Sequence, residues 1–182
     1  MKQAVQNEQS SLEYTLGQLK QLLGTWIGAG KGQFPSPTVD DFSYRETLEF
    51  RHRGGDIPYV TYEQSTELID TDGQPVELAH WEAGILRPQV DGSIVMSSAH
   101  DSTRVEVLTG VLENENPDTG AFTLKLESSL LGNDPRMASS AREFIFAGNE
   151  LRYRMSMATN TTEKTQGVPE LSLHLEAKLE RG

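Results

Sequence analysis

Four histidines are the side chains of this chain best suited to hold a metal ion or to transfer protons near neutral pH: His52, His80, His100 and His174. Cysteine is absent, which excludes a disulfide, a thiolate nucleophile and a cysteine-ligated zinc or iron–sulfur centre. No nucleophile–base pair and no spaced pair of carboxylates suggests catalysis by side chains alone. His52, in the charged run RHR, is expected to face solvent, and His100, next to a turn, is assigned no role.

His80 stands in a segment whose alternation points it inward. It shares a face with Val76, Leu78 and Leu86 in a pattern of period two, and that face is expected to be the interior. A buried histidine needs a partner for its ring nitrogens. A hydrogen bond to Glu82 or to a backbone carbonyl would meet that need.

His174 lies in the segment LSLHLEAKL, where strict alternation puts it on the polar face with Ser172 and Glu176. That face would ordinarily be the solvent side of a strand. Two arrangements would still turn His174 inward. One is a β-bulge between His174 and Ala177, which switches faces, and the other is a leucine face that points outward against an N-terminal helix.

The elements that must position these histidines are predicted to be strands. Alternating segments separated by turn signals such as Asp72-Gly73 and Asp91-Gly92 predict hairpins with type I′ turns and an up-and-down antiparallel β-barrel, because closure removes exposed sheet edges. About ten strands are expected in a single domain over residues 10–182, after a tail at 1–9. They are predicted at 23–32, 43–53, 57–70, 75–88, 93–100, 103–113, 120–131, 138–147, 150–159 and 169–181.

One short helix is predicted before the first strand, over about residues 10 to 22. Leucines recur there at intervals of three or four residues, which indicates one apolar helical face. Ser10 or Ser11 could cap this helix, and Glu13 follows Ser10 at the spacing of a capping box. We expect the helix to cover part of the sheet or one end of the barrel.

The charge and the apolar content of the chain exclude several classes of binding partner. The formal net charge of −11 and the lack of a basic cluster argue against binding to nucleic acid or to an anionic membrane surface. The first twenty residues lack the apolar core of a signal peptide, and no apolar run is long enough to span a bilayer. The absence of cysteine suits a reducing compartment, so a soluble, cytoplasmic protein is expected.

The segment GTWIGAG fits the pattern GxWxGxG through Gly24, Trp26, Gly28 and Gly30, and it resembles the signature of the nitrobindin family of lipocalin-like barrels. The glycines are expected to let the first strand bend without crowding the interior. Further motifs of that family follow in the same order along nearly the whole chain. They are Pro37-Thr38-Val39, Ile57 to Tyr62, Ala79 to Gly84 with Arg87, Val105-Glu106-Val107, Arg142-Glu143-Phe144, Met157-Ala158-Thr159 and His174-Leu175.

The resemblance implies a haem b protein that isomerises peroxynitrite to nitrate at ferric iron and binds nitric oxide reversibly in the ferrous form. It implies that His174 ligates the iron, that His80 lies on the opposite, open side, and that Thr38 and Met157 contact the haem. Trp26 would close one end of the barrel. Residues 160–166 make a longer connection than the family has, which a longer hairpin can absorb.

Two other functions stay open at this stage. A barrel that carries a fatty acid or another apolar molecule would need a buried Arg–Tyr cluster for the carboxylate, which Arg142, Arg152 and Tyr153 could supply. A ligand-free scaffold or interaction domain is favoured if His174 points outward. A homodimer is compatible with all three functions.

Overall fold

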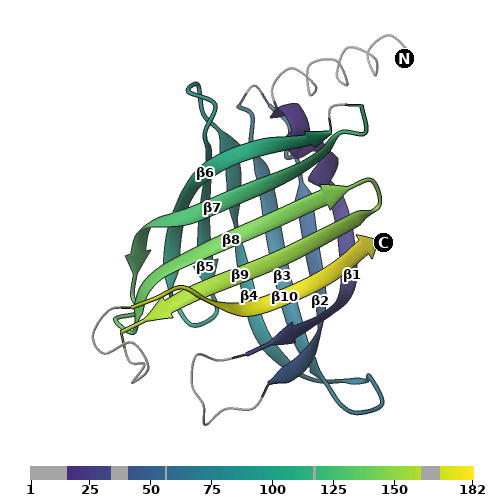
Figure 1. Ribbon diagram of the computed structural model, residues 1–182, viewed down its shortest axis with the longest axis vertical. Helices are drawn as coiled ribbons and strands as arrows, with labels where there is room; N and C mark the ends of the chain where they lie inside the picture. Colours follow the sequence, from purple (N-terminus) through teal and green to yellow (C-terminus); the bar gives the residue numbers. More distant parts are fainter. Residues whose placement is uncertain (1–15, 34–40, 56, 117, 161–168) are drawn as a thin grey trace.

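The chain folds into one closed β-barrel in which every strand is antiparallel to both neighbours. The computed structural model describes residues 16–33, 41–55, 57–116, 118–160 and 169–182. Successive strands pair in chain order, and the first and last strands pair with each other to close the barrel (Figure 1). The strands are β1 (Gly24–Gly32), β2 (Phe42–Arg51), β3 (Val60–Ile69), β4 (Pro75–Pro88), β5 (Ile94–His100), β6 (Val105–Asn116), β7 (Ala121–Gly132), β8 (Met137–Ala147), β9 (Glu150–Thr159) and β10 (Ser172–Arg181).

The predicted up-and-down barrel and its ten strands are confirmed. The predicted turn type is wrong at both Asp-Gly hairpins. A type I′ turn needs positive φ at two residues, yet only Gly73 (φ 76°) and Gly92 (φ 86°) have it. Each glycine instead ends a three-residue turn. The β5–β6 hairpin has the same pattern of backbone bonds, but there the left-handed position is occupied by Thr103 (φ 67°).

The barrel interior is divided into an apolar half and a polar half. Polar side chains gather toward the end at which β10 begins, the lower end in Figure 1. Large apolar side chains fill the other half, namely Trp26, Leu48, Phe50, Leu86, Met96, Leu108, Phe122, Leu124, Phe144, Phe146, Leu151 and Leu179. The buried polar residues toward that end are Glu46, Gln64, Thr66, Glu82, Ser98, His100, Arg104, Glu106, Ser140 and Arg142, whereas Thr123, also buried, lies between Phe122 and Leu124 on β7.

A short helix, η1 (Gly17–Leu22), closes the apolar end. Leu16 is α-helical, but residues 17–22 form a 3₁₀ helix and do not continue the predicted helix, because Gly17 has a left-handed φ of 55° that an α-helix does not accommodate. The predicted helical residues 10–15, with the capping serines, lie outside the described residues. Trp26 is fully buried beneath η1 and donates its indole N–H to the carbonyl of Leu22 at 2.7 Å.

The glycine run of β1 provides space for aromatic rings from β2. A Cβ at Gly30 would lie 2.3 Å from the Tyr44 ring, and one at Gly32 would lie 2.1 Å from the Phe42 ring. These glycines face those same aromatic residues in the β1–β2 register. The run therefore does relieve crowding, as expected, but the space is used by the protein's own rings.

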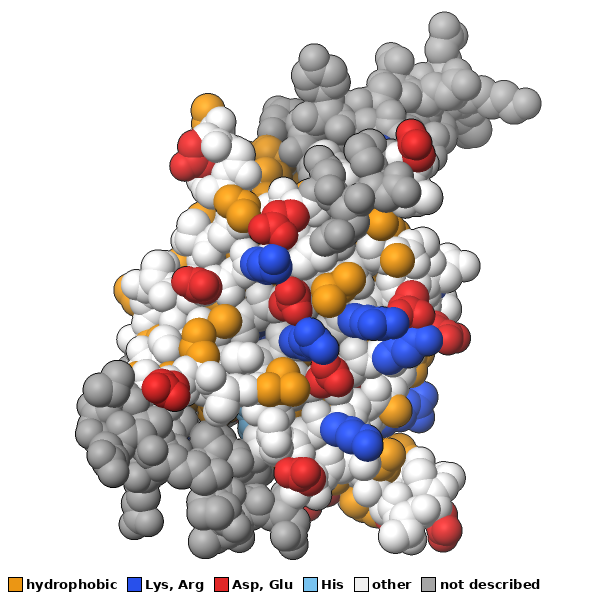
Figure 2. All heavy atoms as spheres, viewed as in Figure 1, with side chains coloured by type: hydrophobic (Ala, Val, Ile, Leu, Met, Phe, Trp, Pro, Cys, Tyr) orange, Lys and Arg blue, Asp and Glu red, His pale blue; other side chains and the backbone are white. Residues whose placement is uncertain are grey.

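The outer face shown in Figure 2 carries interleaved basic and acidic side chains. Arg154 pairs with Glu176 at 2.6 Å and Lys178 with Glu150 at 2.8 Å, across strands β9 and β10. These side chains are between a third and three-fifths exposed, from 32% to 58%, so each pair contributes little stability. Within the part of the chain that the structure describes, no helix combines the length and the apolar character needed to cross a membrane.

Candidate functional site

His174 is the extra residue of a β-bulge in β10. The pairing with β9 runs Leu173 opposite Ser156 and then Leu175 opposite Met155, so the register shifts by one residue at His174. A bulge was one of the two arrangements predicted to turn His174 inward, and it occurs at His174 itself instead of between His174 and Ala177. The other arrangement, a leucine face that points outward along the whole strand, is wrong because Leu175 and Leu179 are buried, although Leu173, before the bulge, is exposed.

The backbone of Gln33, the residue directly after β1, holds the His174 ring. Nδ1 lies 2.6 Å from the carbonyl oxygen of Gln33, and the Gln33 N–H donates to the His174 carbonyl at 2.8 Å. A carbonyl can only accept, so Nδ1 carries the hydrogen and the lone pair of the neutral ring is on Nε2. Burial lowers the pKa of His174, against the opposing effect of the Gln33 hydrogen bond and with the charge of Arg104 acting in the same direction as burial, so the ring is neutral at pH 7.

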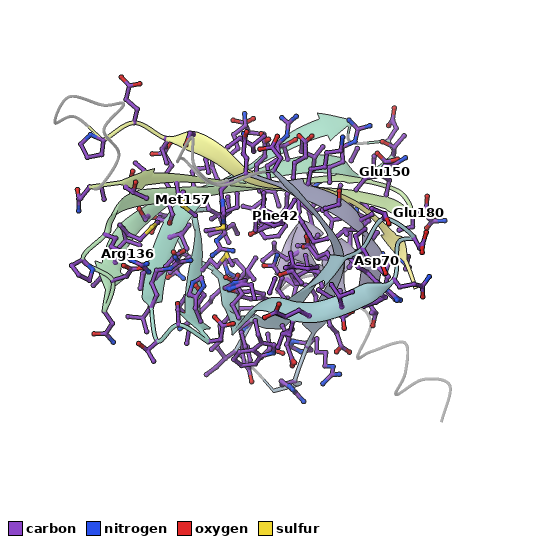
Figure 3. The ribbon with its side chains drawn as sticks, turned by 90° about the horizontal axis from the view of Figure 1, so that it is seen from below. Phe42, Asp70, Arg136, Glu150, Met157 and Glu180 are labelled. Carbon is purple, nitrogen blue, oxygen red and sulfur yellow. The ribbon has the colours of Figure 1, made fainter. Side chains whose placement is uncertain are left out.

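Apolar side chains lie next to His174. The Phe42 ring contacts it edge-on, with ring centroids 6.4 Å apart, and Phe42 occupies the space left by Gly32. Met157 is buried on β9, and the view from below shows Phe42 and Met157 within the ring of strands (Figure 3). Thr38, the other predicted haem contact, lies outside the described residues.

A buried ion pair crosses the polar half of the barrel. The Arg142 guanidinium binds both oxygens of Glu82, at 2.6 and 2.9 Å, and also donates to Glu106 at 3.1 Å and to the Tyr153 hydroxyl at 2.6 Å. Tyr62 donates to Glu82 from the other side at 3.1 Å. Burial alone would raise the pKa of Glu82, but Arg142 and the two nearby histidines hold that pKa well below its usual range, so Glu82 is ionised.

His80 binds Glu82, as one of its two interpretations predicted. Its Nε2 lies 3.2 Å from Glu82 Oε2, and its Nδ1 lies 3.4 Å from Asp101 Oδ1. The expectation that Val76 and Leu78 share its interior face is wrong, because both are exposed. The β3–β4 register skips Ala79, and this bulge turns the residues before His80 away from the barrel.

His100 is a site residue that the sequence analysis missed. Its side chain is fully buried, with Nδ1 3.0 Å from Glu82 Oε2 and 3.1 Å from Arg104 Nη2. Burial lowers the pKa of His100 to about 4, with Glu82 opposing and Arg104 reinforcing the shift. The alternating pattern of β5 could have predicted that His100 is buried, because His100 is the last of the inward-facing residues of this strand. They are Ile94, Met96, Ser98 and His100.

The Arg–Tyr cluster expected of a fatty-acid carrier forms only in part. Arg142 and Tyr153 do meet, but Arg142 is already bound to two carboxylates of the protein. Arg152 is exposed on the outer face and pairs with Glu150 at 2.8 Å. A fatty-acid carboxylate would therefore have to displace a buried internal ion pair, which is costly.

A closed up-and-down barrel with a histidine turned inward at its polar end belongs to the class of small-ligand-binding β-barrels. Residues 15–181 match the family model described as THAP4-like, heme-binding beta-barrel domain, and the chain belongs to this family. The resemblance to the haem-binding nitrobindin barrels is thereby confirmed.

Proteins of similar sequence and structure support the assignment of the chain to this family. The chain is 34% identical to "Peroxynitrite isomerase Rv2717c" of Arabidopsis thaliana over 90% of this chain and 86% of that protein. It is 44% identical to the "Peroxynitrite isomerase" of Streptomyces griseus over 80% of this chain and 83% of that protein. The crystal structure of Rv2717c from M. tuberculosis superposes with a TM-score of 0.74 at 30% identity, covering 94% of this chain and 97% of that one.

The residues at the lower end fit a haem. His174 is a neutral imidazole whose Nδ1–H is bound by a backbone carbonyl, the arrangement that orients a metal-ligating histidine and leaves Nε2 as the donor atom. Phe42, Met157 and Leu175 supply apolar surface of the kind that a macrocycle needs. One neutral imidazole together with these apolar side chains suits the haem that proteins of this family bind.

Proposed function

We propose that the protein binds haem b through His174 and isomerises peroxynitrite to nitrate, and that it binds nitric oxide reversibly when the iron is ferrous. The observation that carries the proposal is the bulge at His174, which takes that residue out of the polar, outward set of β10 and joins its ring to the Gln33 carbonyl. Relatives named peroxynitrite isomerase, at 32–44% identity, supply the reaction.

The chain's own residues contribute ligation, shielding and position. His174 supplies the Nε2 lone pair, and the Gln33 carbonyl fixes the orientation of its ring. Ferric haem, when bound, supplies a Lewis-acidic iron with an open coordination position. Phe42, Met157 and Leu175 would supply apolar groups around bound haem and its ligand, which would favour completion of the isomerisation over loss of reactive fragments to water.

His80 is the proposed neighbour of the open position. It is half-buried and lies between the carboxylates of Glu82 and Asp101, so its ring is held in place without a bond to the cofactor. We assign Thr38 and Met157 to contacts with the haem itself. The absence of cysteine suits a reducing compartment, and the cytoplasm is where we expect the protein to act, as a monomer or a homodimer.

Haem titration of two histidine variants tests the assignment. His174→Ala removes the ligand that ties the iron to the protein, so we expect its haem affinity to fall sharply and its Soret band to change. His80→Ala should keep the Soret band and the haem affinity of the parent, while nitric oxide association and peroxynitrite turnover change. His52→Ala, at the other end of the barrel, is the matched control.

An unchanged Soret spectrum and affinity in His174→Ala would refute the ligand assignment. A parent chain that takes up no haem would refute the proposed function altogether.

A further inference from the structure

The structure brings three potential metal ligands together on one inner face of β4 and β5. His80 and Glu82 are two residues apart on β4, so both point inward, and His100 is the direct partner of Glu82 in the β4–β5 register. Their ligand atoms all lie within 4.8 Å of one another. This convergence follows from strand geometry and does not involve His174 or Gln33.

The distances between these ligand atoms are close to the distances between atoms that coordinate one metal ion. Glu82 Oε2 lies 3.0 Å from His100 Nδ1 and 3.2 Å from His80 Nε2. Ligands about 2.0–2.2 Å from a tetrahedral ion lie about 3.3–3.6 Å from one another. A small outward shift of the three side chains would therefore admit an ion that all three contact.

Each histidine also has a partner on the nitrogen that faces away from Glu82. His80 Nδ1 lies 3.4 Å from Asp101 Oδ1, and Asp101 is held in turn by the Trp81 N–H, 3.0 Å from its other oxygen. His100 Nε2 lies 3.3 Å from Ser98 Oγ. Metal-ligating histidines are usually held in this way, with a carboxylate or another polar group on the remote nitrogen.

Charges around the cluster set what it can bind. Glu82 and Glu106 pair with the guanidinium groups of Arg142 and Arg104, Asp101 pairs with His80, and Asp134 lies 4.0 Å from Arg104 Nη1. His100 Nδ1 lies between an Arg104 N–H and a Glu82 oxygen, and one nitrogen cannot both accept from the first and donate to the second. A cation at Nδ1 would relieve this conflict, with Arg104 turning toward Asp134.

We propose that His80, Glu82 and His100 bind one divalent transition-metal ion of the Zn²⁺ or Fe²⁺ type, at a site separate from the haem ligand His174. Two imidazoles and one carboxylate suit these ions, and three protein ligands leave a position for water or a small anion. The site shares His80 with the pocket of the proposed haem function, but it is separable from haem ligation, since none of its three ligands binds the haem iron.

The test is equilibrium dialysis of the full chain against Co²⁺, with and without bound haem, followed by elemental analysis that counts cobalt and iron separately. We expect one Co²⁺ per chain in the parent, displaced by Zn²⁺. His80→Ala should weaken Co²⁺ binding by about a hundredfold, and Asp101→Asn, an exposed position, by about tenfold. Arg104→Gln should strengthen it, because the competing guanidinium is gone.

Two controls separate this site from the haem site. His52→Ala should bind Co²⁺ as the parent does, and His174→Ala should keep Co²⁺ binding while losing haem. Circular dichroism confirms that each variant is folded. The proposal is overturned if the parent takes up no stoichiometric Co²⁺, if His80→Ala takes up as much as the parent, or if His174→Ala loses the Co²⁺.

Discussion

Glu46 makes the stability of this barrel depend on pH in a way that a single substitution can remove. The side chain is fully buried on β2, and one carboxyl oxygen accepts a hydrogen bond from Gln64 at 2.9 Å. Burial raises the pKa of Glu46 from 4.5 to about 8, and the negative charge of Glu82 acts in the same direction. The folded protein therefore keeps Glu46 protonated at pH 7, whereas the unfolded chain does not.

The sign and size of the effect follow from proton binding. Between pH 4.5 and 8 the folded state holds one more proton at Glu46, so the free energy of unfolding falls by about 1.4 kcal/mol per pH unit as the pH rises. His100, whose pKa is lowered from 6.5 to about 4, has the opposite effect, but only below pH 6.5. From pH 6.5 to 8 the Glu46 contribution stands alone, and the parent should lose about 2 kcal/mol.

The assay is urea denaturation followed by tryptophan fluorescence at several pH values between 6.5 and 8. Glu46→Gln carries no titrating proton, so its free energy of unfolding should stay constant from pH 6.5 to 8. Because the parent loses stability over the same range, the difference between the variant and the parent should shift by about 2 kcal/mol in favour of the variant. Glu127→Gln, at an exposed position on β7, should follow the parent. A parent whose stability is constant from pH 6.5 to 8, or a Glu46→Gln variant with the parent's slope, would refute the reasoning.

Three further substitutions test the packing. Trp26→Ala should lower the free energy of unfolding by about 3–5 kcal/mol, because it empties a fully buried site under η1, and an unchanged urea midpoint and slope would contradict this. Thr103→Gly should raise the free energy of unfolding by about 1 kcal/mol, since a β-branched residue is strained at φ 67°. A loss of stability in this variant would show that no strain is present. Gly32→Ala places a methyl group 2.1 Å from the Phe42 ring, which must then move. Haem affinity should therefore fall while circular dichroism still shows a folded barrel. An unchanged haem titration would show that Phe42 is not part of the haem site.

Strand positions were predictable because a barrel imposes period two on every strand, and this pattern is visible in short windows of sequence. The bulge at His174 was predictable only as an alternative, because alternation alone assigns this residue to solvent. The bond from Arg142 to Glu82 joins residues 60 positions apart, and no local pattern encodes such a pair. His100 was missed because its neighbour Asp101 begins a turn, although the strand stays regular up to the histidine itself.

The hydrogen bond from His174 to Gln33 joins residues 141 positions apart, across the seam where β10 meets β1. Contacts of such long sequence separation form late, because the loop entropy must be lost before they are made. The proposed iron ligand therefore acquires its orientation only when the barrel closes. During synthesis, the first nine strands can form ladders with their neighbours, yet they cannot present an oriented ligand until β10 has been made. Cofactor capture and completion of the fold thus become one event, and bound haem would hold the seam shut.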